Sequence, residues 1–228
     1  MGGWGEIALA MAVFLGSHAL AVRPGLKAPL VRLLGRAGFG IIYSALSLVL
    51  LGWLILAAGR APFVPLWDPA PWQAWLALGL MLAACLLVAN AVALPNPLSF
   101  GSRAEGFDPA RPGIAGVARH PVLLALAFWA LAHLFANGNL AHLLLFAPLG
   151  LFALIGMIAI DRRKQRALEG WEDLARNTSL VPLAALVSGR WRPKAPPPVL
   201  ANLAGLVVWM LLLALHPVVI GVDPLAWF

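Results

Sequence analysis

RHPVLLALAFWALAHLFANGNLAHLLLFAPLGLFALIGMIAIDRR, residues 119–163, is the stretch of sequence that decides the fold. It contains two apolar runs joined by Asn-Gly-Asn at residues 137–139, and its basic residues lie only at its two ends. Asn and Gly favour tight turns, so the stretch predicts two membrane helices that form a hairpin. Three of the chain's five histidines, His120, His133 and His142, fall within it. Ionisable side chains are costly inside a membrane, so each of these histidines is a candidate functional residue.

The composition of the whole chain indicates an integral membrane protein. Of its 228 residues, 62% are hydrophobic and 11% are charged, and the mean hydropathy is +0.89. A soluble domain has about 25% charged residues, so this chain has too few of them to cover a surface that faces water. The single cysteine, Cys85, excludes an intrachain disulfide and a metal site built from several cysteines.

Six apolar runs are long enough to cross a membrane as helices, which takes about 20 residues. We therefore expect an all-α integral membrane bundle of about six transmembrane helices. The expected helices cover Trp4–Val22, Phe39–Ala58, Trp72–Leu94, the two runs of the hairpin and Val199–Ile220. A signal peptide is the rival interpretation of the first run, but Glu6 stands where a signal peptide has basic residues. The Pro-rich residues 192–198 cannot continue a helix, so they mark the boundary before the last run.

The distribution of the basic residues predicts the orientation in the membrane. Of the 16 Lys and Arg residues, 15 lie in the first, third and fifth loops, and only Arg60 lies in a loop of the other side. Basic residues concentrate on the cytoplasmic side of membrane proteins. We therefore expect a protein of the bacterial inner membrane with both termini in the periplasm. The net charge of +7 then reflects this orientation and an attraction to anionic membrane lipid, and it does not require nucleic acid as a partner.

Two histidines lie where a metal or haem ligand would suit, because neutral imidazole is a common nitrogen donor to metals. His18 lies about one turn from the expected cytoplasmic end of the first helix, and a hydrogen bond to a carbonyl is the alternative. His133 lies near the outer end of its helix, and an interhelical hydrogen bond is the alternative there. His142 follows the turn at a similar distance, so we expect it near His133, with a hydrogen bond as the favoured interpretation.

The inner end of the hairpin begins with Arg119 and His120, which a proline follows. Free backbone N–H groups at a helix start, together with Arg119, would favour a bound anion, and a helix start held among lipid headgroups is the alternative. His216 precedes a proline near the end of the last run, and we expect it at the membrane interface. Asp161, with the two arginines that follow it, is interpreted as a charged segment after the end of the fifth helix.

Hydrolase chemistry has no support in the sequence. A nucleophile elbow G-x-S-x-G and a zinc-binding H-E-x-x-H are both missing. We also expect no carboxylate inside the membrane, and hence no buried acid–base pair for unaided proton chemistry. Chemistry within the bundle would then require a cofactor, for which the histidines are the plausible protein ligands.

Three segments together resemble the NnrU family: GSHAL at residues 16–20, the hairpin from RHP to the Asn-Gly-Asn turn, and DRR at residues 161–163. The resemblance covers roughly residues 10–193, which implies an NnrU-like membrane domain at 1–195 and an additional C-terminal transmembrane helix at 196–228. The family is named for its association with nitrite and nitric oxide reduction. Its relative, the zeta-carotene isomerase, is an integral membrane haem b enzyme.

The resemblance implies that two histidines hold haem b, and these correspond to His18 and His133. A redox-sensitive cysteine of the isomerase corresponds to Ala130, so an exchange of thiolate for histidine on the iron is not available here. The helix between His120 and His133 spans about 20 Å, which places His18 nearer to His120 in membrane depth. We therefore keep His120, with Arg119 beside it, as the substitute ligand.

The leading expectation is a haem b-binding membrane protein linked to redox or nitrogen-oxide (denitrification) physiology. Cis-trans isomerisation of a polyene, a hydrophobic small molecule, is the first reaction to test. The first alternative is a lipid- or prenyl-directed S-adenosylmethionine methyltransferase, because Arg-His-Pro before a helical hairpin is similar to isoprenylcysteine and phospholipid methyltransferases. Against it, Arg162 and Arg163 stand where acidic residues would bind the cofactor, and Tyr43 is the only tyrosine. The second alternative is a non-catalytic membrane assembly factor with structural histidines.

Overall fold

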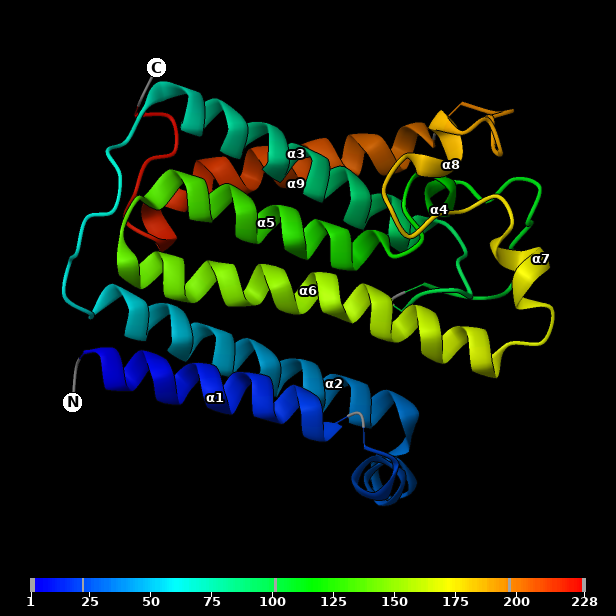
Figure 1. The fold of residues 1–228 in the computed structure, drawn as a ribbon, viewed down its shortest axis with the longest axis horizontal. Helices are drawn as coiled ribbons and strands as arrows, with labels where there is room; N and C mark the ends of the chain where they lie inside the picture. Colours follow the sequence, from blue (N-terminus) through cyan, green and yellow to red (C-terminus); the bar gives the residue numbers. More distant parts are fainter. Residues whose placement is uncertain (1–2, 22, 101, 197, 227–228) are drawn as a thin grey trace. The chain divides into compact units, whose positions relative to one another are not determined.

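The computed structural model describes all residues except 1–2, 22, 101, 197 and 227–228 (Figure 1). The regular secondary structure of the described residues is helical, apart from one isolated β-bridge between Pro65 and Asn139. The helices are α1 (Trp4–Ala21), α2 (Pro24–Gly59), α3 (Pro71–Ala93), α4 (Ile114–Val117), α5 (Pro121–Asn137), α6 (Leu140–Ala167), α7 (Trp171–Ala175), α8 (Ala184–Val187) and α9 (Val199–Val219). Val22, the expected end of the first helix, lies outside the described residues.

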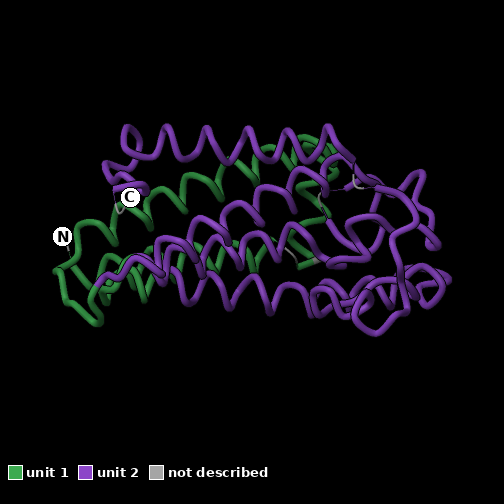
Figure 2. The backbone as a smooth tube through the Cα atoms, turned by 90° about the horizontal axis from the view of Figure 1, so that it is seen from above, with its two compact units in different colours: residues 1–68, 137–145 green, residues 69–136, 146–228 purple. Residues whose placement is uncertain are grey.

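The predicted all-α membrane fold is confirmed. Five of the described helices, α1, α2, α3, α6 and α9, are long and apolar enough to cross a membrane, and α5 is a shorter apolar helix of 17 residues. The predicted hairpin at residues 119–163 is formed by α5 and α6. The chain forms two compact units (Figure 2). Unit 1 comprises residues 1–68 and 137–145, and unit 2 comprises residues 69–136 and 146–228.

In unit 1, α1 packs against α2, and an ion pair joins the start of α1 to the end of α2. Arg60 lies 2.6 Å from Glu6, and the indole of Trp53 donates to the same carboxylate at 3.2 Å. The loop after α2 runs along the Asn-Gly-Asn turn, because the backbone N–H groups of Leu66 and Trp67 both donate to the carbonyl of Gly138.

The sequence predicted a loop between the first two helices of unit 1, but most of this segment is helical in the structure. Helix α2 begins at Pro24, although the sequence predicted a start near Phe39. Gly35 interrupts it with φ 72° and ψ 168°, a backbone conformation that favours glycine. Residues 24–34 therefore form a separate helical segment, which Figure 1 shows end-on as a dark-blue coil below the right-hand ends of α1 and of the rest of α2.

In unit 2, small residues allow the long helices to pack closely. A core of Ala84, Leu87, Ala118, Leu124 and Ala125 lies between α3 and α5. Helix α9 packs on α3, and a Cβ at Gly205 of α9 would lie 3.1 Å from the α3 backbone. Close approach at small residues is a common way for membrane helices to associate. The last helix thus belongs to unit 2.

The short helices α4, α7 and α8 gather at one end of unit 2, together with the loops that carry them (Figure 1). These segments are tied to one another by backbone contacts. The N–H of Leu183 donates to the carbonyl of Val117, and the N–H of Arg119 donates to that of Ser179. The indole of Trp191 packs on Gly116, where a Cβ would lie only 2.7 Å from the ring. We call this end of unit 2 the cap; it holds the start of α5 and the end of α6.

Candidate functional site

The side chain of Arg119 organises a buried polar cluster at the junction of the cap with α5 and α6. Its Nη1 donates to both oxygens of Asp161, at 2.7 and 2.9 Å, and its Nε donates to Thr178 Oγ1 at 2.8 Å. The guanidinium also lies over the ring of Trp171, 5.0 Å from its centroid. Arg119 is only 7% exposed. The sequence predicted that Arg119 would help to bind an anion at the start of α5. In the structure Asp161 already neutralises the Arg119 guanidinium, so this charge is not available to an anion.

His120 is fully buried beside Arg119, and both of its ring nitrogens make hydrogen bonds. Nε2 lies 3.3 Å from Asp161 Oδ1, and Nδ1 lies 3.0 Å from Ser99 Oγ. Burial lowers the pKa of His120, and the Asp161 carboxylate opposes this only in part. The ring is therefore neutral, with Nε2 donating to Asp161 and Nδ1 accepting from the Ser99 hydroxyl. Neither nitrogen presents a lone pair to a metal, which disfavours His120 as the substitute haem ligand.

Sequence reasoning missed this acid–base chain of Ser99, His120 and Asp161. Asp161 lies within α6, six residues before its end, and not after the helix as expected. It thus faces His120 and Arg119 from the neighbouring helix. Ser99 is only 4% exposed, so its hydroxyl is not accessible to act as a nucleophile. A sequence signal existed in retrospect, since Asp161 is the only acidic residue in the hairpin.

His133 lies near the other end of α5, in an aromatic environment. Its Nδ1 lies 2.8 Å from the carbonyl oxygen of Trp129. Its ring centroid lies 5.4 Å from that of Trp129 and 5.1 Å from that of Phe146. A carbonyl oxygen only accepts hydrogen bonds, so Nδ1 of His133 carries a proton. Metal-bound histidines commonly have this arrangement.

His216 of α9 lies next to His133, which the sequence did not indicate. The two ring centroids are 6.3 Å apart, and the ring planes are inclined by only 28°. Nδ1 of His216 lies 2.7 Å from the carbonyl oxygen of Val222, so Nδ1 of this ring also carries a proton. The two rings thus make the same kind of hydrogen bond and lie nearly parallel within unit 2.

His18 belongs to unit 1 and has a local geometry similar to that of His133. Its Nδ1 lies 2.8 Å from the carbonyl oxygen of Phe14, and the rings of Phe14 and Tyr43 lie 4.4 and 5.4 Å from its own. His142, also in unit 1, differs. Its Nδ1 and its backbone N–H both contact Asn139 Oδ1, which thereby caps the start of α6.

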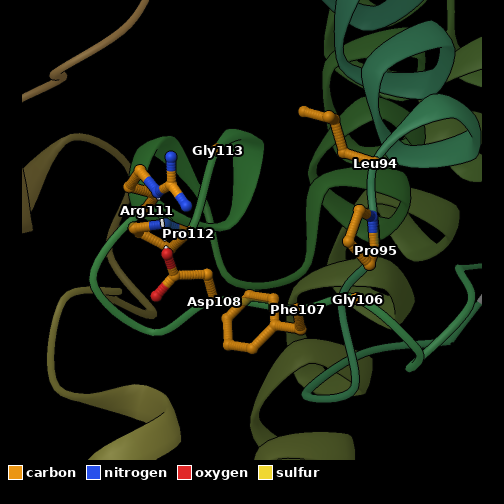
Figure 3. Close-up of a pocket in the computed structure, with 8 residues that line it drawn as sticks. All are labelled: Leu94, Pro95, Gly106, Phe107, Asp108, Arg111, Pro112 and Gly113. Atoms are coloured by element: carbon orange, nitrogen blue, oxygen red, sulfur yellow. Dashed lines mark hydrogen bonds and ion pairs between the residues drawn. The ribbon is translucent and has the colours of Figure 1, made fainter.

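The described part of the chain contains no group of three or more His, Cys, Asp and Glu side chains placed to hold a metal ion. A hollow of about 260 Å³ lies in the cap. Two of the residues that line it, Arg111 and Asp108, form an ion pair at 2.8 Å, and Figure 3 shows them facing each other. The hydrogen bond from Arg111 lowers the pKa of Asp108. None of the candidate histidines lines this hollow.

Comparison with known proteins identifies one family. A sequence model described as NnrU protein matches residues 6–224. The match includes α9, so it extends beyond the resemblance found in the sequence, which ended near residue 193. No curated protein and no solved structure matches the chain.

Proposed function

This chain belongs to the NnrU family, and from that premise we propose that it binds haem b in the bacterial inner membrane and acts in redox or nitrogen-oxide physiology. The observation that carries the proposal is the pair His133 and His216. Two nearly parallel imidazoles, each with its Nδ1 proton donated to a backbone carbonyl, lie together in unit 2.

The donor chemistry of this pair fits a haem iron. His133 and His216 are the residues that would hold the iron, because an imidazole nitrogen is a common protein ligand of haem. The centroids of His133 and His216 are 6.3 Å apart. The aromatic rings of Trp129 and Phe146 beside His133 supply the apolar contacts that a porphyrin prefers. His120 does not fit, because hydrogen bonds occupy both of its nitrogens.

His18 is the partner of His133 that the family resemblance implies, and its own Nδ1–carbonyl bond gives it a suitable tautomer. We propose His133 as a ligand in either case and His216 as the second ligand. Haem, when bound, would supply electron transfer or Lewis-acid chemistry toward a hydrophobic small molecule. Isomerisation of a polyene is the first reaction to test, although Ala130 rules out a thiolate exchange. Ala130 is buried and packs toward Gly150 of α6.

The test is the absorption spectrum of the full-length protein, purified in detergent from cells supplied with a haem precursor. We expect a Soret band that shifts on addition of dithionite, and a pyridine haemochrome spectrum of haem b. Replacing His133 or His216 with Ala should each reduce haem content or convert a six-coordinate to a five-coordinate spectrum. His142→Ala is the matched control, because its ring contacts Asn139, and it should leave the spectrum unchanged.

Imidazole rescue separates a lost ligand from a misfolded variant. His133→Gly should regain the six-coordinate spectrum when free imidazole is added, whereas a misfolded protein should not. A colourless wild-type protein from haem-replete cells would refute haem binding altogether. If His18→Ala abolishes the haem spectrum and His216→Ala leaves it intact, the second ligand is His18, as the family resemblance implies, and not His216.

A further inference from the structure

The helical segment at residues 24–34 is strongly exposed: residues 25–34 are all exposed except Val31, which is half-buried. All of α2 would span about 54 Å at 1.5 Å per residue, much more than the hydrocarbon thickness of about 30 Å. The interruption at Gly35 leaves residues 36–59, about 36 Å of helix, to cross the membrane. The shorter segment turns away, and Figure 1 shows it end-on beside the ends of α1 and of the remainder of α2, which run from side to side in the same view.

One face of this segment is an exposed leucine stripe. Leu26, Leu30 and Leu33 follow one another at spacings of four and three residues, which places them on one face of a helix. Their side chains are 48, 45 and 80% exposed. Exposed leucines at this spacing suit an apolar environment better than water.

Two cations flank the leucine stripe, one on each side. Lys27 follows Leu26 and Arg32 precedes Leu33, and successive residues of a helix are 100° apart. The Lys27 ammonium lies 5.7 Å from the centroid of the Phe39 ring, so it contacts the helix beyond Gly35. No acidic residue occurs between Glu6 and Asp68. The segment therefore has no acidic residue of its own. The only acidic residue in α1 and α2 is Glu6, which lies at the other end of α1.

The neighbouring helices fix where this segment lies. It begins three residues after the end of α1 and ends at the turn into the crossing part of α2, so both of its ends are at the ends of membrane-spanning helices. We infer that residues 24–34 lie in the membrane surface, with the leucine stripe in the acyl boundary and with Lys27 and Arg32 bound to the phosphates of anionic lipids. A basic amphipathic helix in the interface gains affinity from both the apolar face and the charges.

The test uses the full-length protein in nanodiscs, with a fluorescent NBD label at Leu33→Cys in a Cys85→Ala background. Lipids that carry a doxyl quencher near the headgroup are supplied either as phosphatidylcholine or as phosphatidylglycerol, at equal mole fraction. We expect the anionic quencher to be about twofold more effective, because basic residues concentrate anionic lipid around them. A label at Val49→Cys, exposed on the crossing part of α2, is the control and should show a smaller difference.

The charge variants decide whether the cations cause the preference. Lys27→Gln with Arg32→Gln should make the two quenchers equally effective at residue 33, and Lys27→Arg with Arg32→Lys should restore the preference. A label that aqueous iodide quenches and neither lipid quencher reaches would refute the surface location. Equal quenching by both lipids in the unmodified segment would refute the binding of anionic headgroups.

Discussion

Replacing Asp161 with Asn removes one charge from the polar cluster around Arg119 and leaves the size of the side chain almost unchanged. Arg119 would keep its bond to Thr178, but its guanidinium would lose both carboxylate contacts, at 2.7 and 2.9 Å. The side chains of Arg119 and Asp161 are only 9 and 16% exposed, so water cannot readily replace the lost partner. Removing one partner of a buried pair typically costs about 3–5 kcal/mol.

The same substitution also affects His120, whose Nε2 donates to Asp161. An Asn side chain can still accept this bond through its oxygen, so the main loss remains the charge opposite Arg119. A cost of about 3–5 kcal/mol corresponds to a fall of roughly 10 °C in the apparent Tm of a chain of this size. The measurement is thermal unfolding of the detergent-purified protein, followed by circular dichroism and by loss of the monodisperse peak in size-exclusion chromatography.

Asp173→Asn is the matched control, because Asp173 contacts Arg176 only at 3.9 Å and both side chains are largely exposed. It should change stability by less than about 0.5 kcal/mol. The double replacement Arg119→Met with Asp161→Leu should be less damaging than Asp161→Asn alone, because it leaves no unpaired buried charge. If Asp161→Asn unfolds within about 2 °C of the wild type, the cluster does not contribute the stability that its burial implies.

Three further predictions follow from local features. Burial lowers the pKa of His120 from its usual value of 6.5, so the unfolded chain binds this proton more readily than the folded protein does. The stability of the folded protein should therefore fall as the pH drops below 6.5 toward the lowered pKa. His120→Gln should flatten that part of a plot of Tm against pH. Gly35→Ala should destabilise unit 1 by about 1–3 kcal/mol, because φ 72° with ψ 168° is a conformation that essentially only glycine adopts. Gly52→Ala, at a helical position with open space, should be neutral or stabilising in the same unfolding assay. Gly116→Ala should cost about 1–3 kcal/mol, because its Cβ would overlap the Trp191 ring, and a change in tryptophan fluorescence would accompany the lower Tm; an unchanged Tm would show that the indole moves away at no cost.

Hydrophobicity was sufficient to predict the helices that cross the membrane. Each apolar run of about 20 residues became a helix, because the backbone must satisfy its own hydrogen bonds in lipid. The start of α2 was wrong by 15 residues, since its first segment carries Lys27 and Arg32 and was therefore interpreted as a loop. Charge marks contact with water or headgroups, and it does not exclude a helix.

The candidate site was only partly predictable, because it depends on contacts between distant segments. His120 and Arg119 were recognised from their position before α5, but their partner Asp161 lies 42 residues from Arg119 and was assigned to a helix end. His133 was recognised, whereas its neighbour His216 lies on a different helix and had no local signal. Pairings of this kind follow from helix packing, which a single sequence does not specify.

The ion pair between Glu6 and Arg60 has a consequence for the voltage across the membrane. With the orientation that the basic residues predict, Arg60 is the one Lys or Arg on the outer side. A potential that is negative inside pulls an uncompensated cation inward, with about 2.3 kcal/mol per charge for each 100 mV. Glu6, 2.6 Å away, cancels that charge. The membrane potential therefore exerts almost no net force on this end of the α1–α2 pair. The other 15 Lys and Arg residues are predicted on the inner side, which is the side toward which the potential pulls cations.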